Sequence, residues 1–295
     1  MKISIIGSGA MGSLFGGRLA MSGCQVVLYD VDREHVDAVN KDGLAIEQAG
    51  TGEVTVCRPQ ASTDPEAVRG CDAMIVFVKS TSTAEAARQF APYARADTIV
   101  LTLQNGLGNE AIIREHFGAE RTAAGVTSQG ATFLGPGKIR HAGKGPTHIG
   151  MADGKISRLA PLAEALNAAG FDTHVEGDVA SLIWSKLVVN VGINALTAIM
   201  SQPNGRLLDF EETKAVMADL VAEALAVAKG RGVRITHADS LQTVYDVARK
   251  TGANRSSMLQ DFDRGRLSEI DFINGAIVRE AAALAAVSSP GMTTH

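Results

Sequence analysis

The chain has 295 residues, of which 45% are hydrophobic and 20% charged, and its formal net charge is −4 at pH 7. This length exceeds that of a typical single core and predicts two domains of roughly 100 to 200 residues each. The chain has no block of like charges, which argues against a nucleic-acid surface or a polybasic membrane patch and favours a small molecule as partner. No uninterrupted apolar run is long enough for a signal-peptide core or a membrane span, which predicts a cytoplasmic protein without a membrane partner.

The three cysteines are Cys24, Cys57 and Cys71, and they lie in or beside predicted strands. None has CxxC spacing, so the sequence favours reduced, structural thiols over disulfides or a bound metal. No metal is expected.

The N-terminal residues combine a strand, a glycine turn and a helix. A short buried-strand pattern at 3–6 runs into the fingerprint GSGAMG, which is followed by apolar residues at helical spacing. The first glycine allows the turn, the second admits a pyrophosphate, and the third lets the helix pack on the strand. A purely structural glycine turn is the alternative. The predicted cofactor-binding residues here are Gly7, Ser8, Gly9, Ala10, Met11 and Gly12.

A second predicted strand, at 25–29, ends at Asp30, 18 residues past the last fingerprint glycine. A carboxylate at about this offset accepts hydrogen bonds from the adenosine ribose and repels a 2′-phosphate, so Asp30 favours NAD(H) over NADP(H). Arg33 and Lys41 could still neutralise a phosphate. Alternatively, Asp30 caps the helix that begins near Arg33, a task that Asp32 could equally perform.

Further strands at 73–78 and 98–103 alternate with a helical pattern at 83–94, which predicts a parallel sheet with crossover helices. Ligands of such sheets bind at the carboxyl ends of the strands. Lys79 and Asn105 follow these two strands, and we predict that both contact a ligand near the nicotinamide end of the cofactor. Alternatively, Lys79 is a solvated strand end and Asn105 part of a turn.

Residues 123–151 alternate short strands with glycine turns, which predicts an antiparallel or mixed extension of the sheet. His141 and His148 lie there and are expected to be strand or turn residues. A helix at 156–169 and a strand at 172–176 complete a predicted Rossmann-type domain over residues 1–177.

Residues 178–295 form the predicted second domain, because strand signals give way to helical periodicity at 179–200, 213–231, 238–250 and 269–287. An all-helical domain after a dinucleotide-binding domain leaves a cleft for substrate. The apolar helices could also form a homodimer interface, although core packing explains them equally well.

The helix at 179–200 carries the most informative pattern of the second domain. Lys186, Asn190 and Asn194 recur at intervals of four within an almost wholly apolar stretch. Each step of four advances the side chain by about 40°, so one helix presents all three on a narrow stripe. An ammonium and two amides need polar partners when buried. The stripe therefore predicts either a polar ligand or a polar seam against another helix.

A second polar cluster runs through NRSSMLQD at 254–261 and SEIDFING at 268–275. Asn254 or Ser256 can cap a short helix, and Ser268 can cap the long helix at 269–287. Glu269 would then be a first-turn acid that the helix dipole favours, so spacing alone assigns it no catalytic role.

These motifs resemble those of the ketopantoate reductase family (2-dehydropantoate 2-reductases). The resemblance rests on GSGAMG, QNG at 104–106, WSKLVVNVGINALTAI at 184–199, PNG at 203–205, NRSSMLQD and EIDFING, and it runs to about Pro290. It implies NADP(H)-dependent reduction of 2-dehydropantoate to (R)-pantoate in pantothenate biosynthesis. It also implies Lys186 as the catalytic lysine and Glu269 as its acidic partner. The implied substrate contacts are Asn105, Asn190, Asn194, Asn254 and Ser257, and the implied cofactor contacts include Lys79, Asn105 and Glu269.

The chain departs from the family pattern at two places. Asp30 stands where the family typically has a basic residue, which keeps open an NADH-dependent D-2-hydroxyacid dehydrogenase of the same family that acts on another 2-keto acid. A non-catalytic dinucleotide-sensing protein is a third alternative. After Pro290 only GMTTH remains, and we expect looser packing there.

Overall fold

The computed structural model describes residues 1–288, which form parts of two compact units. The first unit consists of Met1–Gln104 and Asn109–Val179, and the second of Asn105–Gly108 and the chain from Ala180 on. The predicted domain boundary between residues 177 and 178 stays a prediction. The predicted loose packing after Pro290 lies outside the described residues.

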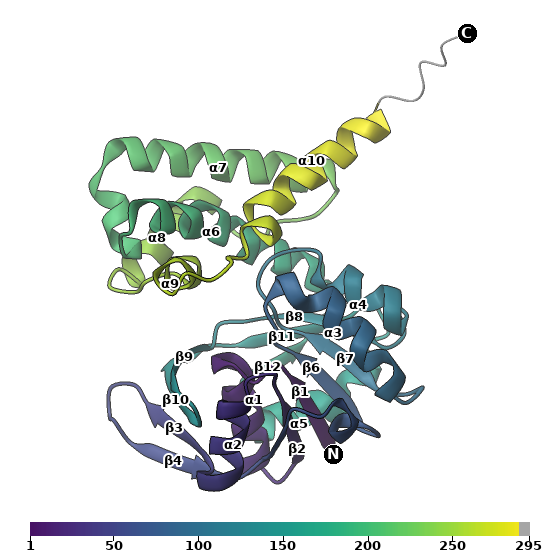
Figure 1. Cartoon of the computed structure of the whole chain (residues 1–295). Helices are drawn as coiled ribbons and strands as arrows, with labels where there is room; N and C mark the ends of the chain where they lie inside the picture. Colours follow the sequence, from purple (N-terminus) through teal and green to yellow (C-terminus); the bar gives the residue numbers. More distant parts are fainter. Residues whose placement is uncertain (289–295) are drawn as a thin grey trace. The chain divides into compact units, whose positions relative to one another are not determined.

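An eight-stranded sheet forms the centre of the first unit (Figure 1). Its strands are β1 (Lys2–Ile6), β2 (Gln25–Tyr29), β5 (Gln60–Ser62), β6 (Ala73–Val76), β7 (Ile99–Thr102), β8 (Thr122–Thr127), β11 (Thr147–Met151) and β12 (Thr173–Val175). They follow the order β12-β11-β8-β7-β6-β1-β2-β5, and every neighbouring pair is parallel except β8 with β11. Every residue of β6 and β7 is buried, as expected for parallel strands that are covered on both faces.

Helices cover both faces of this sheet. They are α1 (Ala10–Met21), α2 (Arg33–Asp42), α3 (Thr83–Phe90), α4 (Asn109–Phe117) and α5 (Ala160–Ala168), with short 3-10 helices at Pro65–Val68, Ser80–Ser82, Ala91–Tyr93 and Ile156–Leu159. Apolar residues of α1 and α5 share one core with β1 and β6. Residues of α3 and α4 form a second core with the opposite side chains of the same strands. The predicted parallel sheet with crossover helices is therefore confirmed.

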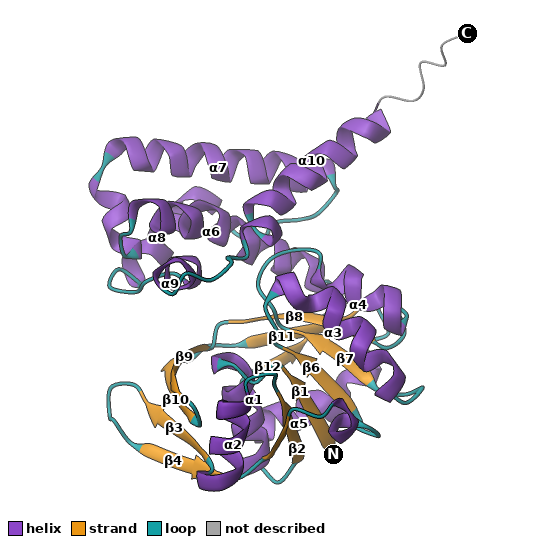
Figure 2. Ribbon diagram, viewed as in Figure 1, coloured by secondary structure: helices purple, strands orange, loops and turns teal. Residues whose placement is uncertain are grey.

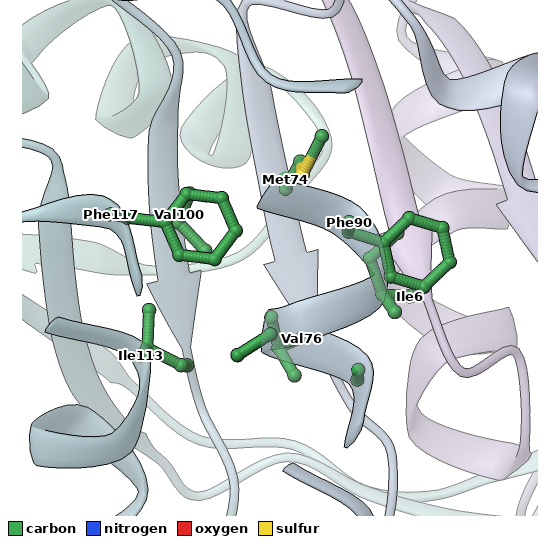
Figure 3. A pocket seen from close by; sticks show the side chains of 9 residues that line it. Ile6, Met74, Val76, Phe90, Val100, Ile113 and Phe117 are labelled. Carbon is green, nitrogen blue, oxygen red and sulfur yellow. The ribbon is translucent and has the colours of Figure 1, made fainter. Parts of the chain in front are cut away.

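The second of these cores contains a small gap (Figure 3). Nine apolar side chains from β1, β6, β7, α3 and α4 surround a cavity of about 10 Å³, including Ile6, Phe90 and Phe117. A cavity of about this size holds at most one water molecule, and a water needs polar partners that these side chains lack. It is a packing gap and no ligand site.

A second, four-stranded sheet corrects the expectation for residues 123–151. It contains β3 (Leu44–Gln48), β4 (Val54–Cys57), β9 (Gly130–Gly135) and β10 (Lys138–Gly143) in the order β4-β3-β10-β9. Only β8 and β11 of the predicted extension join the main sheet (Figure 2). The strand β10 pairs instead with β3, more than 90 residues earlier in the chain, a partner that local pattern could not reveal. His141 lies in β10 and His148 in β11, as expected.

The second unit is helical, as predicted. Its helices are α6 (Val179–Met200), α7 (Glu211–Gly230), α8 (Ser240–Lys250), α9 (Ser257–Asp263) and α10 (Asn274–Ser288), with 3-10 helices at Asn204–Asp209 and Ile270–Phe272. By length and hydropathy α6 could cross a membrane, but 61% of its most apolar window is buried within the protein. Leu187, Val188 and Val191 of α6 pack with residues of α7 and α8 in the core of this unit. Core packing accounts for the apolar composition of α6.

The long C-terminal helix begins five residues later than the sequence predicts. The chain forms a 3-10 turn at Ile270–Phe272, and α10 starts at Asn274. The Phe272 carbonyl accepts a hydrogen bond of 2.8 Å from Leu107 N, so it is not used within a helix. The prediction that Ser268 caps the long helix is therefore wrong, since its hydroxyl accepts only a 3.4 Å contact from Ile270 N at the 3-10 turn.

All three cysteines lie within the described residues and are free thiols, with Cys57 and Cys71 buried. Burial raises the pKa of the Cys57 thiol to about 11 and also raises that of Cys71. Cys57 and Cys71 are therefore protonated, buried thiols, and the absence of disulfides among the three cysteines agrees with the reduced thiols that the sequence favours.

Candidate active site

The glycine fingerprint forms the turn between β1 and α1. Gly7 has a φ of +91°, and a Cβ there would lie 2.7 Å from Val78 N, so only glycine fits. A Cβ on Gly12 would lie 2.0 Å from the Gly7 carbonyl oxygen. At Gly9, by contrast, an added Cβ meets nothing within 4 Å. The protein itself does not demand a glycine at position 9, which fits a requirement for close approach by a ligand.

The first turn of α1 is open to an anion. Gly9 is the N-cap, no side chain caps it, and the first turn contains no acidic residue. Its free N–H groups and the positive end of the helix dipole suit a pyrophosphate. The residues present therefore fit the diphosphate of a dinucleotide.

Asp30 binds the backbone of the glycine turn. Its Oδ2 accepts hydrogen bonds from Ser8 N at 2.6 Å and from Ser8 Oγ at 3.3 Å, while Oδ1 accepts from Asp32 N at 3.0 Å. Asp32, and not Asp30, caps α2 through a 3.1 Å bond from His35 N. The capping alternative for Asp30 is therefore wrong. A carboxylate has about four acceptor positions, so Asp30 can still accept from ribose hydroxyls.

Lys79 lies just beyond β6, and Gln104 just beyond β7, at the carboxyl ends of these parallel strands. The Gln104 amide donates to Val78 O at 2.7 Å and to Thr83 Oγ1 at 2.8 Å, which ties the two strand ends together. Lys79 is the N-cap residue of the following 3-10 turn. Its predicted contact with the cofactor stays a prediction.

The helix α6 includes Lys186, Asn190 and Asn194, so all three lie on the predicted stripe. Lys186 is partly buried, and burial lowers the pKa of its ammonium from 10.5 to about 8. The charge of Glu269, which is 7% exposed, opposes this shift and raises the pKa. The pKa of Lys186 thus lies close to neutral pH, and the carboxylate of Glu269 acts on its charge.

The two asparagine amides of the stripe are not satisfied by another helix. Asn194 is 7% exposed and Asn190 is partly buried, yet neither side chain makes a hydrogen bond to any of residues 1–288. A seam between helices would supply such bonds. Because residues 1–288 supply no such hydrogen bonds, we favour the other interpretation, in which the two amides bind a polar ligand.

After Gln104, the last residue of the first unit before the break, residues 105–108 belong to the second unit and contact the turn that follows Glu269. Gly106 has a φ of +88°, and a Cβ there would lie 2.4 Å from the Phe272 carbonyl oxygen. Together with the bond from Leu107 N to Phe272 O, this close contact fixes Asn105 against the turn that follows Glu269. The structure thus brings Asn105 into the same unit as Lys186 and Glu269.

Asn254 is held through the PNG segment. Asn204 N donates to the Asn254 carbonyl at 2.9 Å, and the Asn204 amide donates to Thr251 Oγ1 at 2.8 Å. Ser257 begins α9, whose N-cap is Ser256, the hydroxyl of which accepts from Leu259 N at 3.1 Å. The capping prediction is thereby decided for Ser256.

Two contributors were not among the predicted site residues. Thr197 is fully buried on α6, and its hydroxyl bonds the Asn194 carbonyl at 2.8 Å and Ser256 Oγ at 2.7 Å. Asn274 donates to the Val191 carbonyl at 3.2 Å. These bonds attach the Asn254–Ser257 segment and the start of α10 to α6. The one sequence feature that pointed to Thr197 is its position, three residues after Asn194 and therefore close to the polar stripe.

Two family models match the sequence. The model described as "Ketopantoate reductase PanE/ApbA" matches residues 3–154, and its C-terminal companion matches residues 178–292. The chain belongs to this family. Among its curated relatives, the 2-dehydropantoate 2-reductase of Halobacterium salinarum is 39% identical over 95% of this chain and 92% of the relative. That of Pyrococcus horikoshii is 36% identical over 95% of this chain and 91% of the relative.

Two solved structures are also similar to this chain. A ketopantoate reductase from Ralstonia eutropha superposes with a TM-score of 0.89 at 37% identity, covering 97% of this chain and 93% of that one. A D-mandelate dehydrogenase, solved with NADH and anilino(oxo)acetate, has a TM-score of 0.88 at 29% identity and the same coverages of 97% and 93%. The fold class expected from the sequence is confirmed.

Proposed function

We propose that this chain reduces 2-dehydropantoate to (R)-pantoate with a reduced nicotinamide cofactor, a step in pantothenate biosynthesis. The observation that carries the proposal is the stripe on α6, where a lysine with a pKa of about 8 stands in line with two amides that have no hydrogen-bond partner within residues 1–288. Family membership and the names of the curated relatives support the choice of substrate.

In this mechanism Lys186 is the general acid. A bound reduced nicotinamide supplies a hydride to the C2 carbonyl carbon of the keto acid. The carbonyl oxygen gains negative charge, which the Lys186 ammonium first stabilises and then neutralises by donating a proton. Glu269 favours the charged form of Lys186, so that a proton is available near neutral pH.

The remaining polar groups orient the substrate. Asn190 and Asn194, one and two helical turns beyond Lys186, would bind its hydroxyl and carbonyl oxygens. Asn105, Asn254 and Ser257 would contact its other polar groups, and the fixed backbone around them limits their freedom. Each amide offers both donors and acceptors, which suits a substrate that carries a carboxylate, a carbonyl and a hydroxyl.

For the cofactor, we propose that Gly7–Gly12 hold the diphosphate and that Asp30 selects NAD(H). Lys79, Asn105 and Glu269 would contact its remaining part. Asp30 already accepts hydrogen bonds from the glycine turn, which fixes its carboxylate beside the loop. A fixed negative charge at this place binds ribose hydroxyls and repels a 2′-phosphate.

A second candidate is an NADH-dependent D-2-hydroxyacid dehydrogenase that acts on another 2-keto acid. Asp30 and the likeness to a D-mandelate dehydrogenase solved with NADH favour it. The chain is less similar to that protein, at 29% identity, than to the curated 2-dehydropantoate 2-reductases, at 31% to 39%.

Steady-state rates with three keto acids decide between the candidates. Ketopantoate, phenylglyoxylate and 2-ketoisovalerate are each assayed with NADH and with NADPH. The proposal expects kcat/KM to be at least tenfold higher for ketopantoate than for the other acids, and higher with NADH. A preference for phenylglyoxylate or 2-ketoisovalerate would establish the second candidate. Hydride transfer to none of the three would indicate a non-catalytic dinucleotide-binding protein.

A further inference from the structure

A polar pocket lies in the first unit, and its lining includes none of the residues assigned above. It has a volume of about 320 Å³, is open to solvent, and is lined by Arg18, Gln129, His141, Lys144, Gly170 and Asp172, among others. No residue of the glycine fingerprint lines it, nor do Asp30 and Lys79. We call it the Arg18 pocket. Its volume falls within the range of sites for small metabolites, about 300 to 1,000 Å³.

Arg18 is held in place from one side only. Its Nε donates to the Ala169 carbonyl at 2.9 Å, and its guanidinium lies 5.9 Å from the centre of the Phe171 ring. A Cβ on Gly170 would lie 2.6 Å from Nη2, so the absence of a side chain at Gly170 leaves room for the guanidinium. No carboxylate within residues 1–288 pairs with Arg18. Its two terminal nitrogens therefore keep their donors in a fixed orientation.

Gln129 and His141 form a buried polar pair at the same pocket. The Gln129 amide nitrogen donates to the Gly145 carbonyl, so Gln129 Oε1 faces His141 Nε2 at 2.8 Å and accepts a hydrogen bond from its N–H. His141 is 5% exposed, and its other nitrogen, Nδ1, is buried and makes no hydrogen bond within the described residues. Because Nε2 carries the proton of the neutral ring, Nδ1 is an acceptor, and the His141 ring forms an uncharged wall of the pocket.

The charge of the Arg18 pocket is positive. Lys144 is exposed and forms no ion pair with any described residue. The one carboxylate in the lining, that of Asp172, lies 3.0 Å from His174 Nε2. Burial lowers the pKa of His141, and the charges of Arg18 and Lys144 lower it further. The positive charges of Arg18 and Lys144 are therefore both close enough to the His141 ring to affect its pKa.

We propose that the Arg18 pocket binds a small oxyanion, the carboxylate or phosphate group of a metabolite. The guanidinium of Arg18 would form a bidentate pair with the anion, the geometry in which arginine binds carboxylate and phosphate most strongly. Lys144 supplies the second positive charge. None of its lining residues is assigned to the keto acid site, and the proposal does not rest on the proposed function.

Calorimetric titration tests this site with two probes, inorganic phosphate and succinate. The titrations use the full-length protein at constant ionic strength, because salt screens such contacts. Each is repeated with saturating NADH, which blocks binding of phosphate to the glycine turn. We expect saturable binding of one probe in 1:1 ratio, retained with NADH, and accompanied by a change in the NMR signal of the His141 ring.

Variants then locate the binding site. Arg18→Gln should weaken binding about tenfold or more, since it removes the bidentate pair, and Lys144→Gln should weaken it several-fold. Arg88→Gln, at an exposed arginine on α3, is the matched control and should bind as the unmodified protein does. Should Arg18→Gln fail to fold, Lys144→Gln still decides, because Lys144 is exposed and makes no contact that the fold requires.

Three outcomes would overturn the proposal. One is that neither probe binds saturably. Another is that binding is unchanged in both Arg18→Gln and Lys144→Gln. The third is that NADH abolishes binding, which would place the anion at the glycine turn.

Discussion

Two carboxylates, Asp30 in the first unit and Glu269 in the second, are held in different ways. Asp30 accepts hydrogen bonds from two backbone N–H groups, those of Ser8 in the glycine turn and of Asp32 two residues later. Glu269 is 7% exposed and acts on a lysine 83 residues earlier, raising its pKa against the effect of burial. The backbone N–H groups that stabilise the charge of Asp30 do not ionise. The partner of Glu269, by contrast, is a lysine that itself gains and loses a proton.

The difference indicates which part of the protein responds to pH. The glycine turn should bind its cofactor alike over a wide pH range, because peptide N–H groups do not ionise. The pair of Lys186 and Glu269 should respond near pH 8, since the pKa of Lys186 is about 8. Five experiments probe this contrast.

Replacing Lys186 should have the largest effect. Lys186→Ala removes the proton donor and should lower kcat about 100-fold or more while the affinity for NADH changes little. Steady-state kinetics and fluorescence titration of NADH measure the two quantities. Lys250→Ala, an exposed lysine in the last turn of α8, is the control. Near-normal turnover in Lys186→Ala would exclude it as the general acid.

The pH dependence of turnover follows from the lowered pKa. Lys186 donates a proton only when charged, and its pKa of about 8 means that the charged form is lost as pH rises through 8. We expect kcat for reduction to fall about tenfold per pH unit above this value. The dissociation constant of NADH should stay constant over the same range. A flat kcat profile between about pH 7.5 and 9.5 would contradict the assignment.

Removing the acidic partner should shift that profile. Glu269→Gln deletes the negative charge that raises the pKa of Lys186, so the alkaline limb should move to lower pH. Turnover near pH 7.5 should then drop about tenfold. Asp271→Asn, two residues away and exposed, provides the control and should leave the limb in place. An unshifted limb in Glu269→Gln would show that Glu269 does not raise the pKa of Lys186.

Asp30→Asn tests the carboxylate in the first unit. Asparagine can still accept from Ser8 N, but it no longer repels a 2′-phosphate, so the ratio of kcat/KM for NADPH over NADH should rise about tenfold. The pH profile should not move. Asp32→Asn keeps a good capping residue on α2 and serves as the matched control. A ratio unchanged in Asp30→Asn would remove Asp30 as the cofactor selector.

Thr197→Val should have the smallest effect. It deletes the hydroxyl that joins α6 to the Ser256 cap, at 2.7 Å, without changing the volume of the side chain much. We expect KM for the keto acid to rise about threefold with kcat nearly unchanged, and Thr197→Ser to restore it. An equal loss in kcat, or no rescue by serine, would mean that Thr197 does not act by positioning the Asn254–Ser257 segment.

The parts of the fold that sequence predicts are local ones. The glycine turn lies within six consecutive residues, and the bounds predicted for α6 agree with Val179–Met200 because apolar residues recur along its whole length. The sheet of β3, β4, β9 and β10 was missed because β10 pairs with a strand more than 90 residues away. Pairing across such a distance leaves no periodic signal in either segment.

The candidate site also combines features that follow from local sequence with features that depend on contacts between distant residues. The stripe of Lys186, Asn190 and Asn194 follows from helical geometry alone. The position of the segment after Asn105 depends instead on a contact across more than 160 residues, the bond between Leu107 N and Phe272 O. This contact also ends the 3-10 turn where the sequence suggested a continuous helix. Family resemblance, and not spacing, singled out Glu269.

The lowered pKa of Lys186 also has a thermodynamic consequence. In an unfolded chain the lysine would bind its proton with a pKa of 10.5, whereas in the folded protein the pKa is about 8. Folding therefore opposes protonation, and below pH 8 this linkage reduces the free energy of unfolding. The reduction fades as pH rises from 8 to 10.5 and is absent above that. Lys186 therefore contributes less to the stability of the second unit at neutral pH than above pH 10.5, and the side chain proposed to donate the proton is charged at a cost to the fold.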